Sequence, residues 1–429
     1  MPSKMWDRAN SVILDGNSLL SKRPERWLPE LWPSHYISAT GVSVLADDGI
    51  EYLDCSLMGV GCCFLGYGNA AVDSAVVEAV RGGVASSLNP FEEVLLAEQL
   101  LALNPGFSFA KFARTGGEIN AQALRYARAI TGKSRALVCG YHGWHDWYLS
   151  INTKNPNGLQ DLLLPGISPL GIEASVRTVG FTYNNVGSFD AAIDKFDDFA
   201  VCFLELYRWD PPSLEFIARV ESVCRAKGIV LVVDECTSGF RNRLGGIYRN
   251  YGFQPDIVTF GKALGNGYAI TAMVMTEEFK ALRDKIFVSS TFWSERLGFT
   301  AGLATIKQLE LTNPYPRVLE LGRWVKAEIN AFSEKNGLKV AVGGMDSLIS
   351  FKFATGHDLK RTILSKNMLA NGILGTNCIY ISAAHEKHHL ERYLGCLEQC
   401  FSLFSSVSDE ELARDYLSTP VARSDFGRL

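Results

Sequence analysis

A carboxylate and an amine stand just beyond two apolar runs in the middle of the chain. Asp234 directly follows residues 229–233, which are all β-branched or leucine, and Lys262 follows the run 256–260 after one glycine. The two lie 28 residues apart, the length of one strand–helix unit. Such a pair suits a cofactor that needs an anion beside a protonated ring nitrogen and an imine-forming amine near its carbonyl. Taken singly, Asp234 also fits as the N-cap of the next segment, and Lys262 as a solvated lysine.

A glycine pair at the start of a helical pattern points to an anion site. The stretch 114–118, Arg-Thr-Gly-Gly-Glu, precedes apolar residues at helical spacing that reach Ile130. Glycines at a helix N-terminus leave backbone N–H groups free to bind an anion, and the helix dipole assists them. We therefore expect Gly116 and Gly117 to bind a phosphate, although glycine-rich helix starts are often only turns. No Gly-Lys-Ser/Thr follows, so the stretch is not a P-loop.

Further polar side chains follow the ends of two other apolar runs. Tyr141 and His142 come after residues 136–139, and Glu205 comes after residues 200–204. Ligands of parallel α/β sheets bind at the carboxyl ends of the strands. We therefore expect these three residues to lie on the same rim as Asp234 and Lys262.

The middle of the chain repeats a strand-then-helix theme that would position these residues. Its apolar runs are what strands of a parallel sheet need when helices cover both faces. A helix is predicted over 214–227, with Gly228 ending it at a C′ position. Upstream, a hairpin is predicted over 44–54 around Asp-Asp-Gly, and helices over about 71–80 and 92–103.

The pattern changes after about residue 311 and predicts a smaller α+β domain. Helices are expected over 318–335, 358–371 and 386–404, and strands over 338–342, 348–353 and 378–382. The predicted organisation is a segment 1–65 that joins the small domain, a large α/β domain over 66–310, and the small domain over 311–429.

Composition excludes several other classes of protein. The chain has 429 residues, of which 47% are hydrophobic and 21% charged, and its net charge is −4. This composition is that of a globular protein, and the charge argues against a nucleic-acid binder. No run is long enough to cross a bilayer, and residues 1–21 do not resemble a signal peptide. Ten scattered cysteines without metal-ligand spacing indicate no metal site and a reducing cytoplasm.

Together, these motifs resemble the class III aminotransferase family of fold-type I pyridoxal-phosphate (PLP) enzymes, and within it the glutamate-1-semialdehyde aminomutase branch. The resemblance covers roughly residues 35–405. The matching segments are 115–118 (TGGE), 121–133, 140–143 (GYHG), 234–241 (DECTSGFR) and 251–267 (YGFQPDIVTFGKALGNG). It implies a large domain with a mostly parallel seven-stranded sheet and a smaller α+β domain.

The resemblance also implies a role for each motif residue. Lys262 would form the Schiff base with PLP and then move a proton, and Asp234 would pair with the pyridine nitrogen. Tyr141 would stack on one face of the ring, and Cys236 would pack on the other, where the family more often has Val. The remaining implied cofactor contacts are Gly116, Gly117, His142, Glu205 near the phenolic side of the ring, and Thr291. Because that threonine reaches the neighbouring subunit's phosphate in the family, a homodimer with shared active sites is implied.

The chain also departs from the family pattern. Gly117 stands where the family has Thr or Ser, so one side-chain contact to the phosphate is lost, and Leu206 replaces a proline. The aminomutase branch's Ser-Pro-Val-Arg, whose arginine holds the substrate carboxylate, is not matched by Ser-Lys-Arg-Pro at 21–24. These changes lie more where substrates bind than where the cofactor binds.

The leading hypothesis is an aminotransferase that moves an amino group from an amino acid, with glutamate as the expected donor, to a carbonyl acceptor. Several aromatic residues would suit a bulky acceptor such as a keto sugar, although they also fit as packing residues: Trp144, Trp147, Tyr148, Tyr207, Trp209 and Trp293. The alternative is an intramolecular aminomutase acting on glutamate 1-semialdehyde. A non-catalytic descendant is disfavoured by the intact Lys262 and Asp234.

Overall fold

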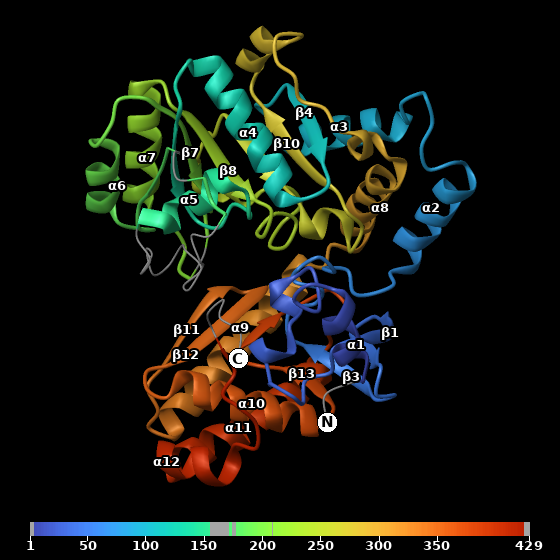
Figure 1. The fold of residues 1–429 in the computed structure, drawn as a ribbon, viewed down its shortest axis with the longest axis vertical. Coiled ribbons are helices and arrows are strands. Elements are labelled where there is room, and N and C mark those ends of the chain that lie inside the picture. Colours follow the sequence, from blue (N-terminus) through green and yellow to red (C-terminus); the bar gives the residue numbers. More distant parts are fainter. Residues whose placement is uncertain (1–3, 155–170, 174–176, 208, 424–429) are drawn as a thin grey trace. The chain divides into compact units, whose positions relative to one another are not determined.

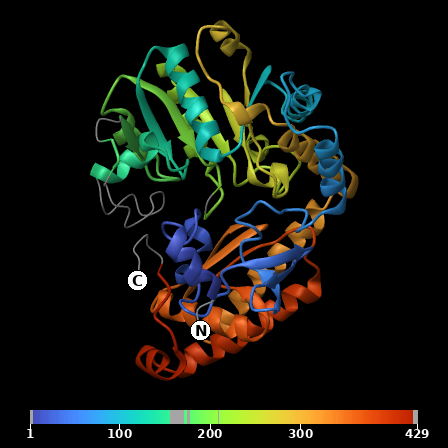
Figure 2. The same ribbon diagram turned by 45° about the vertical axis from the view of Figure 1, so that its right-hand side comes forward.

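The chain divides into two compact units in the computed structural model, which describes residues 4–154, 171–173, 177–207 and 209–423. The large unit comprises residues 70–313, and the small unit comprises residues 1–69 and 314–429. The small unit is thus built from both ends of the chain. Figures 1 and 2 show the two units in two orientations.

The large unit contains a seven-stranded sheet in the order β4-β10-β9-β8-β7-β5-β6. Its strands are β4 (Phe109–Ala113), β5 (Arg135–Cys139), β6 (Thr178–Gly180), β7 (Phe199–Leu204), β8 (Val230–Glu235), β9 (Ile257–Phe260) and β10 (Thr271–Met275). The five strands from β9 to β6 are parallel, whereas β10 runs antiparallel to both of its neighbours. The predicted α/β fold with a mostly parallel sheet is confirmed.

Helices of the large unit pack around this sheet, and α4 lies across its strands (Figure 2). They are α2 (Ala70–Arg81), α3 (Phe91–Leu103), α4 (Gly116–Thr131), α5 (Asp146–Lys154), α6 (Val186–Ile193), α7 (Leu214–Lys227) and α8 (Arg296–Thr312). Short 3₁₀ segments are η3 (Ile247–Tyr251), η4 (Lys262–Gly265), η5 (Glu277–Leu282) and η6 (Thr291–Ser294). The left-handed Gly228 ends α7 as predicted, and the side chain of Ser213 caps its N-terminus.

The small unit has two small sheets and a set of helices (Figure 1). Its strands are β1 (Tyr36–Thr40), β2 (Ser43–Ala46), β3 (Glu51–Cys55), β11 (Val340–Met345), β12 (Leu348–Phe353), β13 (Ile373–Gly375) and β14 (Cys378–Tyr380). Its helical segments are α1 (Lys4–Val12), η1 (Leu20–Lys22), η2 (Pro24–Arg26), α9 (Tyr315–Lys335), α10 (His357–Ala370), α11 (Lys387–Ser406), α12 (Asp409–Glu411) and the short π-helix η7 (Leu412–Tyr416). The predicted β2–β3 hairpin is confirmed.

The structure corrects the sequence predictions in a few places. Asp234 lies inside β8 rather than beyond its end, because its backbone continues the ladder and pairs in register with Thr259 of β9. The strand expected over 338–342 begins two residues later, at Val340. Strand β10 was not predicted, and its antiparallel direction leaves no mark on composition.

Candidate active site

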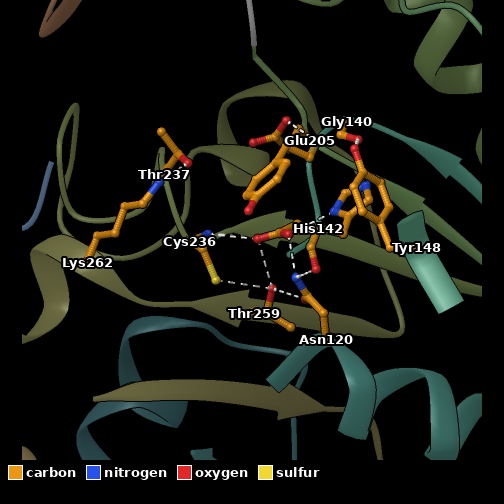
Figure 3. A network of polar contacts seen from close by, with 11 residues as sticks. Asn120, Gly140, His142, Tyr148, Glu205, Cys236, Thr237, Thr259 and Lys262 are labelled. Atoms are coloured by element: carbon orange, nitrogen blue, oxygen red, sulfur yellow. Dashed lines mark hydrogen bonds and ion pairs between the residues drawn. The ribbon is translucent and has the colours of Figure 1, made fainter. Parts of the chain in front are cut away.

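Asp234 is the most heavily hydrogen-bonded residue of the candidate site, and its side chain is 3% exposed. Its carboxylate accepts hydrogen bonds from His142 Nδ1 (2.8 Å), Asn120 Nδ2 (2.7 Å), the Cys236 amide (3.0 Å) and Thr259 Oγ1 (3.2 Å). Figure 3 shows these donors converging from α4, β9, the turn after β8 and the loop after β5. Burial by itself raises the pKa of Asp234, but the bonds from His142, Cys236 and Asn120 outweigh it and lower the pKa. The carboxylate is therefore ionised and ready for a cationic partner.

One of these four donors has a second acceptor within reach. The Thr259 hydroxyl lies 3.1 Å from Asn120 Oδ1 as well as 3.2 Å from Asp234 Oδ1. A hydroxyl carries a single proton, so Thr259 can turn toward Asn120 and free a lone pair on Asp234. The site can thus accept one more N–H donor at Asp234 without leaving any of these groups unpaired.

The loop after β5 holds His142 in the core and Tyr141 at the surface. The His142 ring is buried between Phe203, at 5.3 Å between centroids, and Tyr148, at 5.6 Å. Tyr141 is 41% exposed, and its backbone N–H donates to Glu205 Oε2 at 2.8 Å. Glu205 therefore fixes the backbone that presents the Tyr141 ring. Partial burial, and next the charges of Glu205 and Asp234, raise the pKa of the Tyr141 phenol.

Glycine is required at the start of this loop. Gly140 has φ +130°, and a Cβ atom there would lie 2.7 Å from Glu205 Oε2 and 2.8 Å from its Cγ. Any side chain would combine backbone strain with a steric collision. Gly140 thus allows Glu205 to lie directly against the loop.

Lys262 begins the 3₁₀ segment η4 in a left-handed conformation, with φ +44°. Such a conformation is unfavourable for a lysine and is typically retained where function requires it. The half-buried side chain donates from Nζ to Thr237 Oγ1 at 2.8 Å. In Figure 3, Lys262 and Thr237 lie on one side of Cys236, while His142 and Asn120 lie on the other.

The predicted anion site coincides with the first turn of α4. Thr115 and Glu118 form a capping box that satisfies the amides of Thr115 and Glu118. The N–H groups of Gly116 and Gly117 have no intrahelical acceptor, because the helix begins at Gly116. These amides remain able to bind an anion. A Cβ atom on Gly116 would lie 3.6 Å from the Cys236 sulfur, so this turn adjoins the Asp234 network.

Thr291 lies in η6 and is exposed. The next two residues fix this segment against the start of α4, because Arg114 Nε donates to the Phe292 carbonyl (2.6 Å) and Trp293 Nε1 donates to Glu118 Oε1 (3.2 Å). A contact between Thr291 and the phosphate of a neighbouring subunit stays a prediction.

Sequence reasoning missed four polar residues of the site: Asn120, Thr237, Thr259 and His145. Two of them had a usable signal. Asn120 lies four residues after Gly116, on the same face of α4. Thr259 is the only polar residue of β9 and pairs with Asp234. The other two depend on the path of loops, which the sequence pattern does not reveal.

The site therefore offers an ionised buried carboxylate with a lone pair to spare, a lysine amine, an exposed aromatic ring and two free helix amides. These groups fit a phosphorylated pyridine aldehyde.

A family model of class III aminotransferases matches residues 209–401. The 3-aminobutyryl-CoA aminotransferase of Cloacimonas acidaminovorans (strain Evry) is 31% identical over 349 residues, which cover 79% of this chain and 80% of that protein.

Other relatives and solved structures agree on the fold. The glutamate-1-semialdehyde 2,1-aminomutase of Persephonella marina is 27% identical, over 82% of this chain and 88% of its own. The 2'-deamino-2'-hydroxyneamine transaminase of Streptomyces kanamyceticus is 28% identical, over 85% of this chain and 91% of that protein. The FumI protein of Sphingopyxis sp. MTA144 superposes with a TM-score of 0.85 at 24% identity, covering 97% of this chain and 98% of its own.

The fold is that of fold-type I PLP enzymes. More narrowly, the chain belongs to the class III aminotransferase family, so it is an enzyme and PLP is its cofactor. Among the helices of the described ranges, none is both long and apolar enough to cross a membrane.

Proposed function

We propose that this enzyme is an aminotransferase that moves an amino group from an amino-acid donor to a carbonyl acceptor. Glutamate is the expected donor. The observation that carries the proposal is the placement of Asp234 and Lys262 at one edge of the large sheet, with Asp234 ionised and Lys262 strained. The relative at 31% identity, which is named as an aminotransferase, supports transfer between two molecules.

Each side chain has a role in this proposal. Bound PLP supplies an electron-withdrawing ring that stabilises negative charge on the substrate carbon. Asp234 holds the proton on the ring nitrogen, because its ionised carboxylate has a lone pair that Thr259 can release. Lys262 Nζ would hold the cofactor covalently at rest and, once released, would accept a proton from the substrate carbon.

Other residues bind and orient the cofactor. The amides of Gly116 and Gly117 bind its phosphate. Tyr141 directly precedes His142, which contacts Asp234, and the Cys236 amide donates a hydrogen bond to Asp234. These two side chains would therefore flank the cofactor ring. His142 orients Asp234, and Glu205 orients Tyr141 through its backbone.

The exposure of the aromatic side chains limits which of them could contact the acceptor substrate. Trp147 and Tyr148 are buried, and Trp293 is bonded to Glu118, so these three contribute to packing. Trp144 is 68% exposed and remains available to a bulky acceptor. A keto sugar would suit such a surface, and the relative from Streptomyces kanamyceticus is named as a transaminase of a hydroxyneamine.

The second candidate function is an intramolecular aminomutase. Relatives at 26–28% identity carry that name. This chain lacks the branch's Ser-Pro-Val-Arg, however, so the arginine that holds the substrate carboxylate in that branch has no counterpart at 21–24. We therefore place the aminotransferase first.

A single-turnover experiment separates the two functions. The purified PLP enzyme is mixed with L-glutamate and no acceptor, and 2-oxoglutarate is measured. An aminotransferase releases about one 2-oxoglutarate per site, and a panel of other amino acids identifies the true donor if glutamate fails. Isomerisation of glutamate 1-semialdehyde with no keto acid present, without net oxoacid release from any donor, would instead show the mutase.

The proposal includes a cytoplasmic homodimer, with the large unit as the cofactor-binding domain. Apolar side chains exposed on α3 and near Thr291 support a subunit interface on the large unit: Phe91, Val94, Leu95, Phe287 and Phe292. The ten cysteines are all free thiols, as a reducing compartment favours. Analytical ultracentrifugation of the holoenzyme tests the dimer, and a monomer at micromolar concentration would contradict it.

A further inference from the structure

The space beside Gly117 is filled by a histidine ring. A Cβ atom on Gly117 would lie 2.7 Å from His145 Nδ1 and 2.8 Å from its Cε1. The place in which the family carries a threonine or serine side chain is therefore already taken. This close approach depends on a second glycine, because a Cβ atom on Gly143 would lie 2.7 Å from the Gly117 Cα. The loop can pass the helix at this distance only because both residues lack side chains.

The position of the His145 ring is fixed by its surroundings. Its carbonyl accepts hydrogen bonds from the amides of Tyr148 and Leu149 at the start of α5. Its ring stacks on Trp144, with 4.9 Å between centroids and 24° between planes. The imidazole is therefore held beside the first turn of α4 by the structure of its own loop.

The ring nitrogen that faces Gly117 lacks a hydrogen-bond partner. His145 Nδ1 is inaccessible to solvent and bonds to no group among the described residues. An enclosed polar atom without a partner is unfavourable, and such atoms commonly mark a place for a ligand. The adjacent amides of Gly116 and Gly117 are the free donors of the proposed phosphate site. An anion bound by these amides would lie next to the imidazole, because Nδ1 is only 2.7 Å from the position of a Cβ atom on Gly117.

We propose that His145 Nδ1 donates a hydrogen bond to the phosphate of PLP and replaces the hydroxyl that Gly117 lacks. This inference rests on the proposed phosphate site at Gly116–Gly117. Glycine at 117 leaves room for the His145 imidazole. The imidazole N–H then replaces the hydroxyl donor that a threonine or serine at 117 would supply. His145 is thus a cofactor-binding residue, and it takes no part in proton transfer at the substrate.

The replacement of a hydroxyl at 117 by His145 is tested by the affinity of the apoenzyme for PLP, which fluorescence titration measures without any turnover. His145→Ala is expected to raise the dissociation constant about tenfold, as for loss of a bond to a charged group. Gly117→Ser alone is also expected to weaken binding, because its Cβ collides with the imidazole. The double variant is expected to bind within about threefold of the parent, because the serine hydroxyl then has room to bind the phosphate.

Two further measurements assign the effect to the phosphate. Pyridoxal, which lacks the phosphate, should bind the parent and His145→Ala equally. His145→Asn, which keeps a donor near the position of Nδ1, should bind PLP more tightly than His145→Leu. This pair also preserves the test if the alanine variant fails to fold.

The outcomes separate the inference from the proposed function. If the parent binds no PLP, the proposed function is wrong. If the parent binds PLP, equal affinities of His145→Ala and the parent would overturn the role of His145. The role of His145 would also be overturned if His145→Asn and His145→Leu bound PLP equally. It would be overturned as well if His145→Ala lost as much affinity for pyridoxal as for PLP, or if the double variant bound PLP as weakly as His145→Ala.

Discussion

The two ends of the cofactor site are built in different ways. At the ring end, Asp234 lies inside a sheet and accepts four hydrogen bonds, two from α4 and β9 and two from the loops that follow β5 and β8. At the phosphate end, the donors without a partner among the described residues are two glycine amides and Nδ1 of His145, which lies on a loop. The first arrangement is complete before the cofactor binds, whereas the second is completed by the cofactor. We therefore expect changes at the ring end to impair catalysis and changes at the phosphate end to impair cofactor retention.

The largest effect is expected when the ring end loses its amine. Lys262→Ala should lower turnover by about 10⁴-fold, because no other group can supply the imine bond and the proton transfer. Lys280→Ala, which removes an exposed lysine of the same unit, is the control and should match the parent. Steady-state kinetics at saturating PLP checks this prediction, and turnover above about one hundredth of the parent would contradict it.

The next largest effect is expected at the ring nitrogen. Asp234→Asn should lower turnover by about 10²-fold or more, because a neutral amide cannot stabilise the protonated ring. Asp198→Asn is the matched control, since Asp198 precedes β7 at the opposite edge of the same sheet. Turnover of Asp234→Asn within about threefold of the parent, with PLP bound, would refute this role.

The phosphate end should respond to Thr291 through affinity rather than turnover. Thr291→Ala is expected to weaken PLP retention by about 1–3 kcal/mol if the hydroxyl donates to the phosphate. Equilibrium dialysis measures this loss, and Ser290→Ala is the neighbouring control.

Mixing experiments then locate the contact made by Thr291. A Thr291→Ala chain mixed with a Lys262→Ala chain gives a heterodimer with one intact site if the sites are shared. Activity should therefore reappear at limiting PLP. Absence of recovery, with subunit exchange confirmed by mass, would show that each site belongs to one chain.

The smallest effect is expected from Thr259→Val, which removes one of the four donors to Asp234. The other three remain, so turnover should fall by only a few fold, as for loss of a bond worth about 1 kcal/mol. A loss as large as that of Asp234→Asn would mean that Thr259, rather than His142 and Asn120, controls the carboxylate.

The two ends also differ in how far the sequence predicts them. Asp234 and Lys262 stand at the ends of long apolar runs, so strand periodicity places them on one edge of the sheet. The amides of Gly116 and Gly117 follow from a recognisable helix start. His145 could not be predicted, because its approach to Gly117 depends on the path of a loop and on φ +110° at Gly143. The direction of β10 was equally hidden, since this antiparallel strand resembles the parallel strands of the sheet in composition.

The most direct test of the account is to reduce the purified holoenzyme with borohydride and map the modified peptide by mass spectrometry. We expect loss of the visible absorbance and a reduced pyridoxyl-phosphate adduct on Lys262 alone, with no adduct in Lys262→Ala. An adduct on another lysine, or one that persists in Lys262→Ala, would contradict the assignment of the active site.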